Sequence, residues 1–221
     1  MLTNIFSIFD PSTSSLFSSN WLSMFLSFIF LPNIFWKFKS RINFSFSLLI
    51  KNILKEFKPN FMNNKLNSMI LFLSLFWLIF FYNFLGLFPY IFTPSSHLMI
   101  SLSLALPLWT TLMMFNLMFK FNNFMKHMVP LGTPMILSSF MVIIETLSNI
   151  IRPLTLAIRL TANMIAGHLL INLLSSISEK MMMLFIPSLP ILNCLLLLEI
   201  SVAIIQSYVF TTLISLYYNE I

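Results

Sequence analysis

Long stretches without a formal charge dominate the pattern of hydrophobic and polar positions along the chain. No charged side chain occurs between Asp10 and Lys37, and none occurs between Lys65 and Lys120. A helix needs about 20 mainly apolar residues to cross the hydrocarbon core of a bilayer, so each stretch is long enough for at least one crossing. The pattern therefore predicts a protein that crosses the membrane several times.

Turn-forming residues divide these stretches into separate elements. Gly86, Pro89 and the TPSSH sequence at 93–97 interrupt the longest one, so it is predicted to form a hairpin of two spans. We expect an all-α polytopic membrane protein with five membrane-embedded helices and one interfacial amphipathic helix. Within this single membrane domain the expected embedded segments are 12–36, 66–88, 97–119, 135–178 and 190–218.

The segment 41–58 has a different pattern, with two opposed helical faces. One face carries the apolar residues Ile42, Phe46, Leu49, Ile50, Ile53 and Phe57, and the other carries Lys51, Lys55 and Lys58. A helix of this kind is predicted to lie in the membrane interface.

The segment 135–178 is too long for an ordinary crossing. As one helix of about 44 residues it would extend roughly 66 Å, about twice the thickness of the hydrocarbon core. Two interpretations remain open: the helix breaks near Pro153, or it is steeply tilted.

The basic residues predict the orientation of the chain. Seven of the twelve lie in the first loop, namely Lys37, Lys39, Arg41, Lys51, Lys55, Lys58 and Lys65, and Lys120 and Lys126 lie in a later one. Cytoplasmic or matrix loops are enriched in Lys and Arg. We therefore expect both loops and the C-terminus on that side, and the N-terminus on the opposite side.

Composition excludes several other classes of protein. With 58% hydrophobic and 8% charged residues, the chain has too little polar surface for a water-soluble globule. The net charge of +6 does not indicate nucleic-acid binding, because the basic residues are separated by apolar runs. Cys194 is the only cysteine, no histidines have metal-ligand spacing, and three glycines are too few for a phosphate loop. We expect no metal, cofactor or nucleotide site.

Five ionisable residues fall inside the predicted spans: Glu145, Arg152, Arg159, His168 and Glu199. Such residues are costly in hydrocarbon, so each is a functional hypothesis. His97 and His127, by contrast, are expected in water or among lipid headgroups at the membrane edges.

Helical geometry places most of these residues on shared faces. At about 100° per residue, the polar residues within about 40° of Arg159 are Glu145, Ser148, Arg152, Thr155 and Asn163. His168 points away from this track. On the last segment Glu199 and Gln206 share a face, with the small Ala203 between them. A polar face on each of two helices predicts a packed pair.

Proton transfer fits this set of residue types. Carboxylic acids and imidazoles that are partly removed from water can exchange protons near neutral pH. Arginine stays positive, so Arg159 would act as a fixed electrostatic gate for a partner carboxylate. The alternative is a structural ion pair of Arg159 with Glu199 or Glu145, which explains one pair but not the number of polar groups. Arg152 is expected to anchor or tune Glu145.

The sequence IIRPLTLAIRLTANMIAGHLL at 150–170 resembles the fifth-helix signature of the a subunit of F-type ATP synthases. The resemblance extends over nearly the whole chain through FDPSTS, NFLGLFPYIFTPSSHL, HMVPLGTP and LEISVAIIQSYVFTTLISLYYNE. It is strongest to the mitochondrially encoded form of the arthropod type.

The resemblance implies a non-catalytic, proton-conducting stator subunit in the mitochondrial inner membrane, with its N-terminus on the intermembrane-space side and its basic loops and C-terminus on the matrix side. Its last two helices would be long and steeply tilted, as in the family. It would form two half-channels against a rotating c ring, and its other partners would be membrane and peripheral-stalk subunits. Arg159 matches the essential arginine. The other matching positions are Asn163 and Gln206 beside it, His168 and Glu199 in the intermembrane-space half-channel, and Glu145 with Ser148 and Asn149 near the matrix exit.

Two further hypotheses belong to other classes. A self-contained ion channel or secondary transporter predicts an inverted repeat and a substrate site, and neither is visible in the sequence. A purely structural membrane subunit predicts that the polar track can be replaced by apolar residues without loss of function.

Overall fold

The computed structural model describes residues 5–13, 18–31, 38, 40–60, 66–129, 134–180, 183 and 185–220. Every regular element in this part of the chain is an α-helix or a short 3-10 helix. Four helices are long and apolar enough to cross a membrane, over 68–86, 98–119, 137–178 and 185–218. The expected all-α polytopic class is confirmed.

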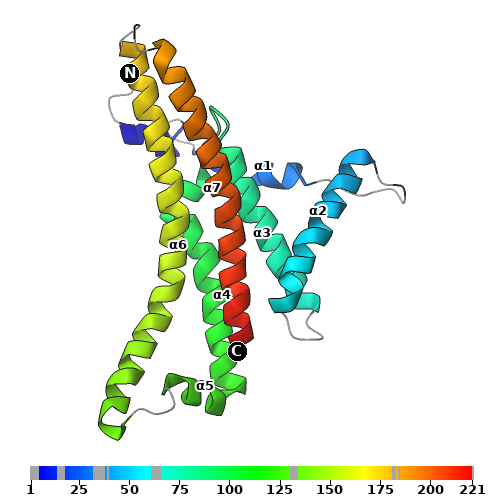
Figure 1. Ribbon diagram of the computed structural model, residues 1–221, viewed down its shortest axis with the longest axis vertical. Coiled ribbons are helices and arrows are strands. Elements are labelled where there is room, and N and C mark those ends of the chain that lie inside the picture. Colours follow the sequence, from blue (N-terminus) through cyan, green and yellow to red (C-terminus); the bar gives the residue numbers. More distant parts are fainter. Residues whose placement is uncertain are drawn as a thin grey trace.

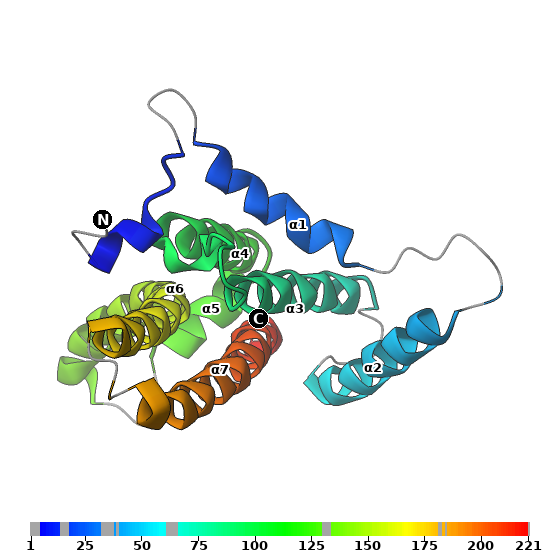
Figure 2. The same ribbon diagram turned by 90° about the horizontal axis from the view of Figure 1, so that it is seen from above.

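These four helices are packed around a common interior, which Figure 2 shows from above. They are α3 (Leu66–Gly86), α4 (Leu98–Phe119), α6 (Met135–Lys180) and α7 (Phe185–Glu220). The helices in contact are α3 with α7, α4 with α6, and α6 with α7. A short helix, α5 (Phe121–Met128), lies between α4 and α6 at the lower end in Figure 1.

The turn between α3 and α4 folds back onto the end of α3. Gly86 is the last residue of α3, and a Cβ atom there would lie 2.9 Å from Cγ2 of Thr93. The turn ends in the 3-10 helix η4 (Pro94–Ser96), which contacts α3, α4 and α6. A residue without a side chain is thus needed where the chain returns to the helix.

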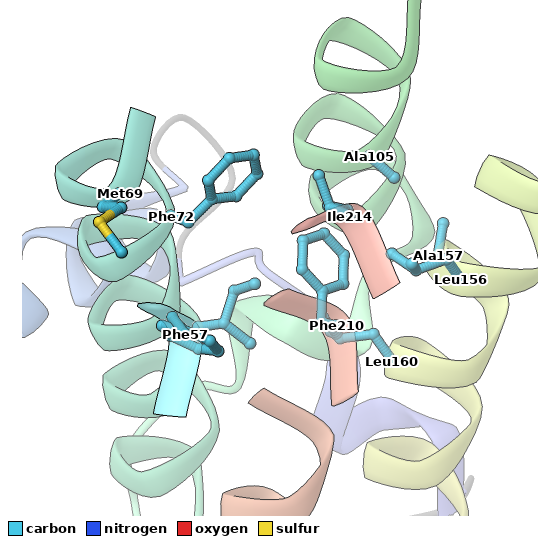
Figure 3. Packing of buried hydrophobic residues seen from close by; sticks show 10 residues of the cluster. Phe57, Met69, Phe72, Ala105, Leu156, Ala157, Leu160, Phe210 and Ile214 are labelled. Atoms are coloured by element: carbon cyan, nitrogen blue, oxygen red, sulfur yellow. The ribbon is translucent and has the colours of Figure 1, made fainter. Parts of the chain in front are cut away.

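The buried core joins α3, α6 and α7. In Figure 3, Phe210 and Ile214 of α7 lie between Phe72 of α3 and Leu160 of α6. The other buried members of this cluster are Phe57, Met69, Ile79, Ala105, Leu156 and Ala157. Because lipid tails are as apolar as these side chains, close packing holds the helices together rather than the exclusion of water.

Small hydroxyl residues allow α7 to approach its neighbours closely. Ser207, Thr211 and Ser215 recur every fourth residue and are fully buried. Their hydroxyls donate to carbonyl oxygens of α7 itself, at 2.7 Å for Ser207 and 2.8 Å for Ser215. Each of these hydroxyls therefore has an acceptor within its own helix, and the small side chains leave room for a neighbouring helix.

Helix α6 is one continuous element of 46 residues. It passes through Pro153 without interruption, and Figure 1 shows it curving along its length. The alternative of a break near Pro153 is wrong. A helix of about 69 Å fits a hydrocarbon core about 30 Å thick only when it is inclined or projects beyond it.

Helix α7 begins at Phe185, earlier than the expected start at residue 190. Pro187 lies in its first turn, where backbone N–H groups have no partner inside the helix, so the missing donor costs nothing there. Pro190 lies inside the helix. A proline near a helix start is therefore a poor marker of the boundary.

The expected first span, 12–36, lies partly outside the described residues. Within it the structure describes a 3-10 helix, η2 (Ser19–Leu22), and α1 (Ser23–Ile29). Seven residues are too few to cross the hydrocarbon core. A crossing by the whole segment stays a prediction.

The amphipathic helix α2 (Arg41–Phe57) begins at a serine cap, where Oγ of Ser40 accepts a hydrogen bond from the Asn43 N–H at 3.3 Å. It contacts α3 through Phe46, whose ring centroid lies 4.4 Å from that of Trp77. Ile42 remains 74% exposed. An apolar surface left open in this way suits contact with lipid, and the interfacial location stays a prediction.

We predict that Ser207→Leu lowers the stability of the protein by about 1–3 kcal/mol, because a larger side chain cannot fit the fully buried site without displacing α7. The thermal melting temperature of the detergent-solubilised complex measures the effect. Ser201→Leu is the matched control, since Ser201 is exposed on the same helix. Equal melting temperatures for the two variants would contradict the packing described here.

Candidate functional site

Arg159 lies on α6 but does not face the helix bundle. Its neighbours Leu156, Ala157 and Leu160 are buried in the core, whereas Arg159 is exposed. None of the described residues forms a hydrogen bond or an ion pair with its guanidinium. A permanent charge on the outside of a helix set in hydrocarbon requires compensation from another molecule.

Glu145 pairs with Arg152 rather than with Arg159. Oε1 of Glu145 lies 3.8 Å from Nη2 of Arg152, two helical turns further along α6. The guanidinium carbon of Arg152 also lies 5.0 Å from the ring centroid of Tyr217 on α7. The alternative of an ion pair between Arg159 and Glu145 is therefore wrong within the described residues.

The polar side chains next to this pair bond to the backbone of α6 or to α5. The hydroxyl of Ser148 donates to the backbone carbonyl of Glu145 at 2.9 Å, not to its carboxylate. Thr155 likewise donates to the carbonyl of Arg152 at 2.9 Å. Nδ2 of Asn149 lies 4.0 Å from Sδ of Met128 on α5. Three residues of the predicted region thus serve backbone or packing contacts.

A hydrogen bond joins α6 and α7 one turn beyond Arg159. Nδ2 of Asn163 donates to Oε1 of Gln206 at 3.2 Å, and Gln206 is buried. Since Asn163 follows Arg159 by four residues, the two side chains lie on the same face of α6. The structure thus brings Asn163 and Gln206 together beside the arginine.

The carboxylate of Glu199 lies directly against the backbone of Gly167. A Cβ atom at residue 167 would overlap the Glu199 carboxyl group and lie 2.9 Å from its Cγ. Glu199 is buried, and neither of its carboxylate oxygens has a hydrogen-bond partner among the described residues. The packing therefore depends on the absence of a side chain at Gly167.

His168 follows Gly167 along α6. Its Nε2 atom is buried and has no hydrogen-bond partner among the described residues. An imidazole and a carboxylate on two facing helices are groups that can accept and release protons. The arrangement can hold a proton between α6 and α7 away from bulk water.

The polar groups occupy successive levels along α6. Glu145 with Arg152, Arg159, Asn163 with Gln206, Gly167 with Glu199, and then His168 follow in this order. From residue 145 to residue 168 the helix rises about 35 Å, which is close to the thickness of the hydrocarbon core. The set therefore extends along much of the length of α6.

Two polar residues were missed or misplaced by reasoning from the sequence. Asn83 is fully buried on α3, and reasoning from the sequence assigned it no function. The one feature of the sequence that could have indicated it is a polar amide within an aromatic-rich run. His97 is not in open water, because its ring lies 5.1 Å from that of Trp21 and 5.3 Å from that of Phe92. The side chain of His127 lies outside the described residues.

Among the described residues, no three His, Cys, Asp or Glu side chains are placed to hold a metal ion. Cys194 is exposed on α7.

Comparison with known proteins places this arrangement in a family. The sequence profile of the family described as ATP synthase A chain matches residues 16–219. The chain is 51% identical to ATP synthase subunit a of Drosophila melanogaster, 49% to that of Aedes aegypti and 47% to that of Locusta migratoria. Each alignment covers 100% of both chains. The chain therefore belongs to the ATP synthase A chain family.

Proposed function

We propose that this chain is the proton-conducting stator subunit of the membrane sector of a mitochondrial ATP synthase, in which Arg159 is the electrostatic gate. The observation that carries the assignment of Arg159 is its exposure on the outer face of α6 at the middle of the row of polar groups. The subunit is non-catalytic, and nucleotide chemistry belongs to other subunits.

The positive charge of Arg159 is compensated by a mobile carboxylate on a neighbouring rotor. A proton that crosses the membrane gains about 2.3 kcal/mol per 100 mV, so several crossings must be added together to drive the synthesis of one ATP. A ring of c subunits that carries carboxylates past Arg159 performs this addition. Arginine cannot give up its proton, so it attracts each ionised carboxylate and prevents a direct leak of protons.

Protons reach and leave this gate through two half-channels. The pair of His168 and Glu199 lies towards the Lys180 end of α6 and receives protons from the intermembrane space. Glu145, held by Arg152, lies towards the Met135 end and releases protons to the matrix. Asn163 and Gln206 line the path beside the gate without carrying charge themselves.

The distribution of basic residues supports this orientation in the inner membrane. Lys120 precedes α5 and Lys126 lies within it, and α5 lies at the same end of the bundle as the C-terminus in Figure 1. Positively charged loops favour the matrix side, which leaves the N-terminus in the intermembrane space. Exposed apolar side chains on α4, α6 and α7 contact lipid, the c ring and the other membrane and peripheral-stalk subunits.

We predict that Arg159→Ala leaves the ATP synthase assembled but abolishes ATP-driven acidification of inverted inner-membrane vesicles, because nothing then attracts the rotor carboxylate or stops the leak. Acidification is followed with a pH-sensitive dye, and assembly is followed on native gels. Lys126→Ala, which removes a cation outside the long helices, is the control and should pump normally. Normal acidification by the Arg159 variant would refute the gate.

Glu199→Gln keeps the shape of the side chain but removes its ability to carry a proton. We expect proton flux to fall about tenfold or more, in the range found when a general acid or base is lost, while the gate remains closed to leaks. Glu56→Gln on the exposed face of α2 serves as the control. An unchanged flux through the Glu199 variant would show that the half-channel has been assigned to the wrong residue.

Gly167→Ala tests the position of the same carboxylate. The added methyl group overlaps the Glu199 carboxyl, so the carboxylate moves and proton flux should fall as it does in Glu199→Gln. The double variant Gly167→Ala with Glu199→Asp shortens the acidic side chain by one methylene and should recover part of the flux. If Gly167→Ala alone conducts protons normally, the close contact is not needed for the path.

A further inference from the structure

Tyr217 is an aromatic side chain between α6 and α7 that the proposed proton path does not use. It lies partly buried near the C-terminal end of α7, and the centroid of its ring lies 5.0 Å from the guanidinium carbon of Arg152 on α6. A guanidinium within about 6 Å of an aromatic ring centroid is attracted by the negative face of the ring. The contact therefore joins the end of α7 to the arginine that pairs with Glu145.

Tyr217 belongs to the face of α7 that makes the other polar contacts with α6. At about 100° per residue, Glu199, Gln206 and Tyr217 lie within about 20° of one another around the helix. Glu199 lies against Gly167, and Gln206 accepts a hydrogen bond from Asn163. Since α6 and α7 run in opposite directions in Figure 1, the ring of Tyr217 continues the same row of contacts.

Arg152 needs a fixed position because it shares a helical face with Arg159. The two arginines are seven residues apart, which places them about 20° apart around α6 and about 10 Å apart along it. Arginine stays protonated in proteins, so both side chains are permanent cations. A second mobile cation beside the gate would compete with Arg159 for the rotor carboxylate.

The ion pair with Glu145 holds Arg152 only loosely. Nη2 of Arg152 lies 3.8 Å from Oε1 of Glu145, and the two side chains are 33% and 40% exposed. Ion pairs between partly exposed groups contribute little to holding a side chain in one place. The ring of Tyr217 gives the guanidinium a further contact, and this contact comes from the neighbouring helix.

We propose that Tyr217 is a further positioning residue of the proton path: its ring holds the Arg152 guanidinium between α6 and α7, beside Glu145 and away from the rotor that passes Arg159. This inference rests on the proposed function and adds a residue of α7 that carries no proton itself. Tyr217 acts through Arg152, and the attraction comes from the ring, so the phenol hydroxyl is not needed. Glu145 then keeps a cation beside it while Arg159 faces the rotor.

The first experiment compares substitutions of Tyr217 in the complete ATP synthase. We expect Tyr217→Leu to slow ATP-driven acidification about three-fold per assembled complex, the effect of one lost cation–π contact, whereas Tyr217→Phe keeps the ring and the rate. Tyr218→Leu makes the same change at the next residue, whose ring contacts Phe72 of α3, and should leave the rate unchanged. The proposal is overturned if Tyr217→Leu pumps normally, if Tyr217→Phe is equally slow, or if Tyr218→Leu slows pumping to the same extent.

A double-mutant cycle separates the contact with Arg152 from the packing of the two helices. Arg152→Gln removes the cation but can still donate a hydrogen bond to Glu145, and in this background Tyr217→Leu should cause no further slowing. The same three-fold loss in both backgrounds would show that the ring only packs α7 against α6, which overturns the proposal. If Tyr217→Leu does not assemble, Tyr217→Met takes its place, because an unbranched apolar side chain fills the space without a ring.

These outcomes are distinguishable from a failure of the proposed function. Arg159→Ala should abolish pumping, whereas the variants of Tyr217 should only slow it. A negative result at Tyr217 therefore leaves the role of Arg159 intact.

Discussion

The cost of placing a charge in hydrocarbon is the constraint on which the rest of this structure depends. Arg159 cannot lose its proton, and in the described residues its guanidinium has no partner within the chain. The structure places it on the outer face of α6, where another subunit can compensate the charge. Compensation by a neighbouring subunit fits a family whose members are ATP synthase subunits. Under the proposed function, an ionised rotor carboxylate compensates Arg159, and the proton that this carboxylate takes up and releases is the cargo.

The surrounding fold packs closely against α6, which carries this charge. Phe210, Ile214 and Leu160 fill the space between α3, α6 and α7, and the hydroxyl residues of α7 allow close approach. Because these hydroxyls are satisfied within their own helix, the interface contains few polar groups that compete with the functional ones. Tight packing of this kind holds the polar groups of α6 and α7 in a constant register.

Some buried polar side chains, unlike these hydroxyls, have no hydrogen-bond partner among the described residues. Glu199, His168 and Asn83 have buried polar atoms that no described residue satisfies. In a protein interior such atoms normally find a partner or water. Buried side-chain atoms without a described partner also occur at Ser23, Trp77, Ser95 and His97, so this property by itself does not mark the proton path. Gly167 provides the space that the Glu199 carboxyl group occupies.

The sequence by itself determined the helical membrane class, the positions of the four long helices and the polar face of α6. Those features are local: an uncharged run predicts a span, and the helical repeat places Glu145, Arg152 and Arg159 on one face. It predicted helix ends less well, as α7 and the unbroken course of α6 through Pro153 illustrate, because a proline can be accommodated near a helix start or in a curved helix. Only the tertiary structure decided which polar groups meet. The hydrogen bond between Asn163 and Gln206, the contact of Glu199 with Gly167 and the burial of Asn83 all depend on how separate helices rotate and pack against one another, and no spacing along a single helix contains that information.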